Sequence, residues 1–181
     1  TATTGNITDT VALAVTGTSS FTTSASNGTI TLNTPAALSG AVSLNTTGSS
    51  GNATLDNGTT ALNIAASTIG GNLTVTAGDS ITDSGVITVG GTASFTTDTT
   101  DKLITLNSQN AVTGQLTFST IGTGGDVTFD NGTTAISLGT ISSGDIGGDL
   151  TLQTDAVTTI SNAVTMNGSG AALSLTVDGG K

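Results

Sequence analysis

The pentad Gly71-Asn72-Leu73-Thr74-Val75 alternates polar and apolar residues after a glycine. This alternation is typical of a short β-strand with one buried and one exposed side. Leu73 and Val75 are therefore expected to face a core, and Thr74 is expected to face solvent. Five further segments have the same form: Gly28–Leu32, Gly40–Leu44, Gly51–Leu55, Gly125–Phe129 and Gly148–Leu152. The chain uses one strand pattern repeatedly.

The segment from Gly51 to Gly58 predicts how one such strand ends. Ala53 and Leu55 are expected to point into the core. Asn57 and Gly58 are expected to form the turn that follows, because both residue types accept a positive φ. The outward positions of this strand are Asn52, Thr54 and Asp56.

A longer repeat contains these pentads. Ile7-Thr8-Asp9 recurs as Ile81-Thr82-Asp83, a spacing of 74, and the same spacing relates Asp56–Ala61 to Asp130–Ala135. The spacing then becomes 77, and the extra residues fall near Ser142-Ser143-Gly144, which predicts a surface loop. We therefore expect one domain over residues 1–181, with internal repeats at about 7–80 and 81–157 and a partial repeat at 158–181.

Stacking is the way in which such short strands can bury their apolar side chains. Identical neighbours about 4.8 Å above and below would pair every backbone group and form a continuous core. The predicted fold is all-β, a right-handed parallel β-helix (β-solenoid) of short stacked strands, since parallel crossovers are right-handed. A 74-residue unit would hold three turns of about 25 residues or four of about 18; we expect the tighter coil, with about eight or nine turns over roughly 40 Å.

Apolar positions keep their character but change size between the repeats. Such changes are expected in a solenoid core that repacks locally, and the four Phe residues are interpreted as core residues. The matched pairs are Ala53 with Val127, Leu55 with Phe129, Leu44 with Phe118, and Val89 with Met166.

The composition excludes several classes of function. The chain has no His, Cys, Arg, Trp, Tyr or Glu, its only cationic side chains are Lys102 and Lys181, and its net charge is −10. Such a surface is not expected to bind nucleic acid or anionic lipid. No apolar run is long enough to span a membrane, and no basic and apolar leader is present, so membrane insertion is not expected.

Catalysis is not expected either. Without His, Cys or Arg, most hydrolase and transferase sites cannot be assembled, so no catalytic residue is predicted and the chain is predicted not to be an enzyme. Asp126 and Asp130 could share an outward face with Thr128 between them, but Asn52 stands in the place of Asp126 in the preceding repeat. We interpret the two carboxylates as a solvated surface pair.

No cofactor and no metal-binding residue are predicted, with structural calcium kept as an alternative because carboxylates are its preferred ligands. The glycine-rich nonapeptides of calcium-binding β-rolls are absent, and Asp is also an ordinary turn residue. The closely spaced pairs are Asp79 with Asp83, Asp98 with Asp101, Asp126 with Asp130, and Asp145 with Asp149.

Asn-x-Ser/Thr sequons are frequent, and glycosylation is kept as a minor hypothesis because a chain so rich in Asn and Thr produces them by chance. They lie at Asn6, Asn27, Asn45, Asn52, Asn57, Asn72, Asn131 and Asn167.

The stretch Gly70-Gly71-Asn72-Leu73-Thr74-Val75-Thr76-Ala77-Gly78-Asp79-Ser80-Ile81-Thr82-Asp83-Ser84-Gly85 resembles the repeats of filamentous-haemagglutinin-like exoproteins of the two-partner secretion pathway. The resemblance implies a rod on, or released from, a bacterial cell surface that serves adhesion, aggregation or biofilm structure. The Asn-Pro-containing motifs of that family's secretion domain are absent here, where Pro35 is the only proline. Export is therefore inferred from the shaft-like repeats alone.

Three functions follow as expectations. The first is the structural shaft of a secreted bacterial adhesin or extracellular fibre, with a host or neighbouring-cell receptor as a candidate partner. The second is a subunit of a self-assembling filament, since an uncapped coil must be continued by flanking repeats or by further copies stacked end to end. The third is an ice-binding solenoid with outward Thr ladders at Thr29/Thr31 and Thr74/Thr76, although Thr also suits exposed strands whatever the function.

Overall fold

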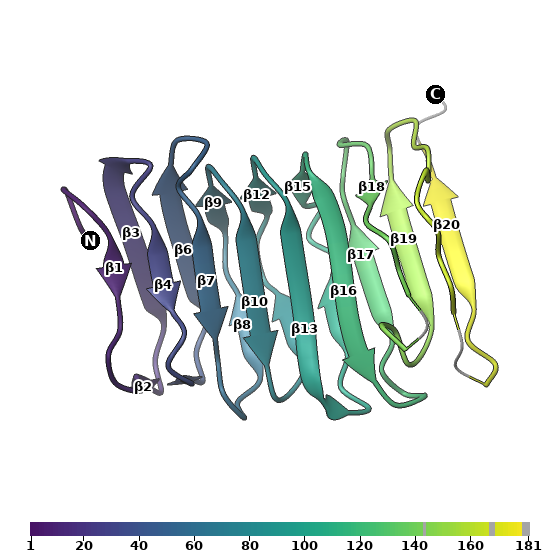
Figure 1. The fold of residues 1–181 in the computed structure, drawn as a ribbon, viewed down its shortest axis with the longest axis horizontal. Coiled ribbons are helices and arrows are strands. Elements are labelled where there is room, and N and C mark those ends of the chain that lie inside the picture. Colours follow the sequence, from purple (N-terminus) through teal and green to yellow (C-terminus); the bar gives the residue numbers. More distant parts are fainter. Residues whose placement is uncertain (143, 167–168, 179–181) are drawn as a thin grey trace.

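A computed structural model describes residues 1–142, 144–166 and 169–178. The described residues form strands and connecting turns without a helix, and every strand pairing is parallel. In Figure 1 the near strands run down and the far strands run up while the chain advances from the N-terminal to the C-terminal end. This sense of winding is right-handed. The predicted parallel β-helix is confirmed, with about seven turns.

One side of the coil is a seven-stranded sheet, whose outer surface we call face 1. It follows the order β1-β4-β7-β10-β13-β16-β18, and its strands run parallel to one another across the long axis on the near side of Figure 1. Its strands are β1 (Ile7–Thr8), β4 (Ile30–Leu32), β7 (Ala53–Asp56), β10 (Leu73–Ala77), β13 (Ala93–Thr100), β16 (Gln115–Ile121) and β18 (Ser137–Leu138).

The remaining sides of the coil are joined through β6, which pairs with both β8 and β9. The outer surface of one rank of strands is called face 2: β8 (Leu62–Ile64), β11 (Ile81–Asp83), β14 (Ile104–Leu106), β17 (Val127–Asp130), β19 (Leu150–Thr154) and β20 (Leu173–Val177). The other rank is β3 (Ser19–Ser26), β6 (Val42–Thr47), β9 (Ser67–Ile69), β12 (Ile87–Val89) and β15 (Ala111–Val112). A short separate sheet pairs β2 (Ala14–Val15) with β5 (Ala37–Leu38).

The strand register gives the length of each turn. The residues stacked in one column of the face 1 sheet are Ile7, Ile30, Ala53, Leu73, Ala93 and Leu116. The steps between these residues are 20 or 23, so the tighter coil that we expected is wrong. The expected count of eight or nine turns, and the axial length derived from it, were too large for the same reason. Wider turns are required because each one carries three strand positions and their corners.

The long repeat does not hold a whole number of turns. Ile7 lies on the face 1 strand β1, and three turns later the chain has returned to this sheet at Leu73. The sequence counterpart of Ile7 is Ile81, which lies on β11 in face 2. Matching residues of the two repeats therefore lie on different faces of the coil.

The change of spacing from 74 to 77 lengthens one turn. The numbering advances by 20 from Ala53 to its stacked partner Leu73, whereas it advances by 23 from Val127 to its stacked partner Leu150. The added residues fall where Ser142 and Gly144 are exposed outside any strand, and β17 and β19 stay in register on either side. The expected surface loop is confirmed at these positions, while Ser143 lies outside the described residues.

The interior is a single apolar column from the first described turns to β19. The residues matched between repeats are buried as predicted, except that Met166 is only partly buried. Phe95, Phe118 and Phe129 pack together, with ring centroids 5.6 to 6.5 Å apart. Phe21 is half-buried and packs against the same core at its N-terminal end.

Glycine opens the pentads because the chain approaches itself closely at one corner. Gly71 N donates to Gly51 O (3.0 Å), Gly91 N to Gly71 O (2.9 Å) and Gly114 N to Gly91 O (3.0 Å). A Cβ on Gly91 would lie 2.8 Å from the carbonyl oxygen of Gly71, closer than side chains tolerate. The corner is thus a stack of glycines joined by hydrogen bonds.

Candidate functional site

The middle of face 1 carries an unbroken column of hydroxyl side chains. The outward residues stack in register from turn to turn, and all are exposed or half-buried. Within the described residues, none of these hydroxyls makes a hydrogen bond to another protein group. The column consists of Thr8, Thr31, Thr54, Thr74, Ser94 and Thr117.

A second column lies two residues before the first along each strand. Its amides are held in place, since Asn52 Oδ1 accepts from Asn72 N at 2.8 Å and Asn72 Oδ1 accepts from Thr92 N at 2.9 Å. Asn6 Oδ1 likewise accepts from Thr29 N at 2.9 Å. This second column is Asn6, Thr29, Asn52, Asn72, Thr92 and Gln115, and it contains no charged residue.

Face 2 has a matching central column, which begins with the amide of Asn63 and continues with hydroxyl side chains, but the column beside it differs. Asn63, Thr82, Thr105, Thr128, Thr151 and Ser174 stack in register. The column before it is Ser80, Leu103, Asp126, Asp149 and Ala172. Asp126 Oδ1 accepts from Asp149 N at 2.9 Å, and Asp149 Oδ1 accepts from Ala172 N at 2.7 Å. The geometry repeats that of face 1, but two of its positions are anionic.

Two buried asparagines were missed by the sequence reasoning. Asn57 is fully buried and is not a positive-φ turn residue, so that part of the predicted turn is wrong; only Gly58 has a positive φ, of 55°. Asn57 Oδ1 accepts from Leu38 N at 2.9 Å, and its Nδ2 donates to Leu38 O at 3.2 Å and Ala61 O at 2.9 Å.

The second buried asparagine, Asn131, makes the matching set of bonds. Its Oδ1 accepts from Val112 N at 2.8 Å, and its Nδ2 donates to Val112 O and Ala135 O, both at 3.1 Å. The side chain of each asparagine thus pairs with the backbone at the end of a strand in the preceding turn, as a residue of a stacked strand would. The strand is β5 for Asn57 and β15 for Asn131. The sequence signal that could have pointed to both buried asparagines was the segment Asp-Asn-Gly-Thr-Thr-Ala, which occurs at 56–61 and again at 130–135.

The acidic side chains serve as hydrogen-bond acceptors at turns. Asp83 accepts from Asn107 N and Ser108 N, both at 3.1 Å, and Asp130 accepts from Gly132 N at 2.8 Å. Within the described ranges, no group of three or more Asp, Glu, His or Cys residues could hold a metal ion. The four Asp pairs named for calcium are not assembled into larger clusters.

Lys102 makes an ion pair with Asp79, with Nζ 3.1 Å from Oδ1. The pKa of the Asp79 carboxyl is lowered from its ordinary value, first by the hydrogen bond from Ser80 N at 2.7 Å and then by the hydrogen bond and charge of Lys102. Both groups are well exposed, so the pair contributes little to stability.

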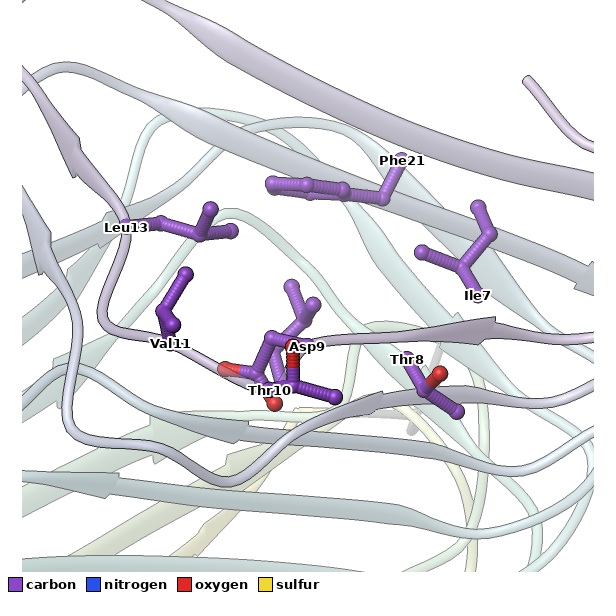
Figure 2. Close-up of a pocket in the computed structure, with 8 residues that line it drawn as sticks. Ile7, Thr8, Asp9, Thr10, Val11, Leu13 and Phe21 are labelled. Atoms are coloured by element: carbon purple, nitrogen blue, oxygen red, sulfur yellow. The ribbon is translucent and has the colours of Figure 1, made fainter.

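A cavity of about 340 Å³ opens at the N-terminal end of the coil, beneath the first turn. Figure 2 shows Ile7, Leu13 and Phe21 converging on it, with Val11 beside them. Ile7 stacks directly on Ile30 of the core. The cavity is therefore the open end of the core column, with Thr8, Asp9 and Thr10 at one side of a largely apolar lining.

The core column is also open at the C-terminal end of the coil. The side chains of β20 that continue the buried columns are exposed: Leu173 at 45%, whereas its neighbour Leu150 on β19 is at 0%. Leu175 and Val177 are similarly exposed. The last described strand has a core-forming side that no further turn covers.

The sequons divide by exposure. Asn57 and Asn131 are inaccessible, Asn45 is half-buried, and Asn167 lies outside the described residues. The exposed ones are Asn6, Asn27, Asn52 and Asn72.

One family model matches the chain over residues 1–45 and 50–119, more than half of its length: repeats of unknown function (DUF5649). The chain belongs to this family. No curated protein and no solved structure matches it. The matched DUF5649 residues cover the first repeat and half of the second, including most of face 1.

The coil described above is thus that of a DUF5649 repeat region, and the chain is a structural repeat protein. The regular features of its surface are the columns of side chains that stack from turn to turn. The sequence predicted no catalytic residue. In the parts of the chain that the structure describes, no helix is long and apolar enough to cross a membrane.

Proposed function

We propose that this chain forms part of the shaft of a secreted bacterial surface adhesin or extracellular fibre, as the resemblance to filamentous-haemagglutinin-like repeats implies. The observation that carries the proposal is the in-register stacking of about seven turns around one continuous core. In such a coil each turn contacts only its neighbours, so length is gained by adding turns. The role of the segment is to hold a binding region away from the cell.

A shaft should depend on length more than on sequence. In the parent gene, residues 53–92 can be removed so that Asn52 is joined to Ala93, which lies two whole turns after Ala53 in the same column of face 1. We expect the shortened protein to fold and adhesion to weaken. Replacement of the same segment by an unrelated β-solenoid of equal length should restore adhesion, measured as cells retained on a receptor-coated surface.

Two results would contradict the shaft role. Failure of the equal-length replacement, with the protein still present at the surface, would assign receptor binding to this segment itself. Immunogold labelling of intact cells tests the location separately, since antibodies against the chain should label the outside of cells without permeabilisation.

The exposed core-forming side of β20 is equally compatible with a second candidate, a subunit of a filament in which further copies stack end to end. Both this candidate and the shaft need a further turn on β20; they differ in which polypeptide provides it. Negative-stain microscopy of the isolated chain separates them. Long uniform fibres would favour the filament, and monomeric rods would favour continuation by flanking repeats.

A further inference from the structure

We propose that face 1 binds ice through its two uncharged columns. This inference goes beyond the shaft role and is independent of it, because a shaft needs no such surface. The two columns are Asn6, Thr29, Asn52, Asn72, Thr92 and Gln115, beside Thr8, Thr31, Thr54, Thr74, Ser94 and Thr117.

The first step is the regularity of the array. Neighbouring turns of a β-solenoid lie about 4.8 Å apart, and residues two apart along a strand lie about 6.6 Å apart. Face 1 therefore repeats polar groups in two directions over six turns. Water molecules in ice also lie in regular rows, so many weak contacts form at once when the spacings agree, as in multivalent binding.

The second step is rigidity. Asn52 and Asn72 are fixed by hydrogen bonds from the next turn, and among the described residues their Nδ2 atoms make no bond to protein. The β-branched Thr side chains have few rotamers, and their strands are held by pairing on both sides. Little side-chain entropy is lost when such a surface binds.

The third step is the chemistry of the groups. Thr offers a hydroxyl and a methyl group, and the two columns hold no charge that would keep its own tightly bound hydration. Asp56 lies in the next column along the strand, where its carboxylate accepts from Gly58 N at 2.8 Å. Ice is the partner that neutral hydroxyl, methyl and amide groups can match together.

Other repetitive partners fit less well. Crystalline polysaccharides are bound largely through exposed aromatic rings, and three of the four Phe side chains are buried while Phe21 lines the cavity at the N-terminal end. Ionic minerals require rows of charge, which these two columns lack. Binding of a polysaccharide is therefore an outcome that the test must distinguish.

The chain contains its own matched control. Thr54 on face 1 and Thr128 on face 2 occupy the same place in the two repeats, both are half-buried, and both lie in the middle of a strand. Thr54→Tyr and Thr128→Tyr place the same bulky group in the hydroxyl column of one face or the other. Circular dichroism and the thermal midpoint establish that each variant is folded.

The measurement is the fraction of fluorescently labelled full chain that enters slowly growing polycrystalline ice, with serum albumin as the non-binding standard. We expect enrichment of the wild type and of Thr128→Tyr, and loss of enrichment to the albumin level for Thr54→Tyr. Thermal hysteresis at high protein concentration should follow the same order.

Three outcomes would overturn the inference. They are a wild-type chain that partitions like albumin, equal losses for the two variants, and retention on crystalline cellulose or chitin without enrichment in ice. The shaft proposal would survive each of them, because it rests on length and is tested in the parent protein.

Discussion

Faces 1 and 2 both stack their strands in register and both carry a central column made mainly of hydroxyl side chains, yet they differ in what stands beside that column. Face 1 has Asn52 and Asn72 there, whereas face 2 has Asp126 and Asp149. The hydrogen bond to the next turn is the same in both, since an amide oxygen and a carboxylate oxygen each accept from a backbone N–H. An amide and a carboxylate therefore serve equally as acceptors at this position, and Leu103 shows that the turns also stack where no side-chain acceptor is present.

The largest expected effect tests the core behind the two faces. Leu55 lies behind face 1 and its counterpart Phe129 lies behind face 2, and both are fully buried. Leu55→Ala should lower the free energy of unfolding by about 2–5 kcal/mol and Phe129→Ala by about 3–5 kcal/mol, because each leaves a cavity. Denaturant unfolding followed by circular dichroism measures both. Changes below about 1 kcal/mol would mean that the core tolerates voids.

The buried asparagines come next. Asn57→Ala and Asn131→Ala should each destabilise by about 1–3 kcal/mol, since both leave buried backbone groups without a partner. Equal losses are expected because the bonds match, although the two repeats are rotated relative to one another. Asn52→Ala is the exposed control and should change stability by less than about 1 kcal/mol. A loss at Asn52 as large as that at Asn57 would contradict this distinction.

A smaller change in stability is expected from altering the charge of face 2. In the Thr54→Tyr background, Asp126→Asn with Asp149→Asn would give face 2 the neutral pattern of face 1. We expect enrichment in ice to return, with stability changed by less than about 0.5 kcal/mol because both sites are exposed. Asp101→Asn with Asp155→Asn removes the same charge at two exposed turn positions outside the strands and should not restore binding. Rescue by both pairs would show that net charge, rather than the flanking column, separates the faces.

The smallest effect concerns Asp79, beside the Ser80 end of face 2. Its pKa is lower in the folded chain, so its contribution to stability is present above the pKa of the unfolded carboxyl and is lost as pH falls through the lowered value. Lys102→Met should move the pKa of Asp79 part of the way back toward 3.8, as followed by NMR titration. Lys102→Arg should keep it low. An unchanged pKa in Lys102→Met would assign the whole shift to the Ser80 hydrogen bond.

Much of the core was predictable because strand alternation alone decides which side chains point inward. Ala53 and Leu55 follow this rule, and so do Val127 and Phe129. Asn57 could not be predicted as a buried residue, because its partner Leu38 becomes its neighbour only when the turns stack. Thr29/Thr31 and Thr74/Thr76 suggested outward ladders, but the two-column array on face 1 depended on register across turns.

The sequence by itself determined the strand pattern, the long internal repeat and the place where that repeat lengthens, because these follow from local alternation and direct comparison of segments. The length of a turn was decided only by the tertiary structure, since closing the coil requires corners whose size the pentads do not encode. The tertiary structure also decided which residues share a face. Three turns bring the chain from Ile7 to Leu73 in the same sheet, and the repeat ends only later, at Ile81 in another sheet, so identical segments present their side chains in different directions.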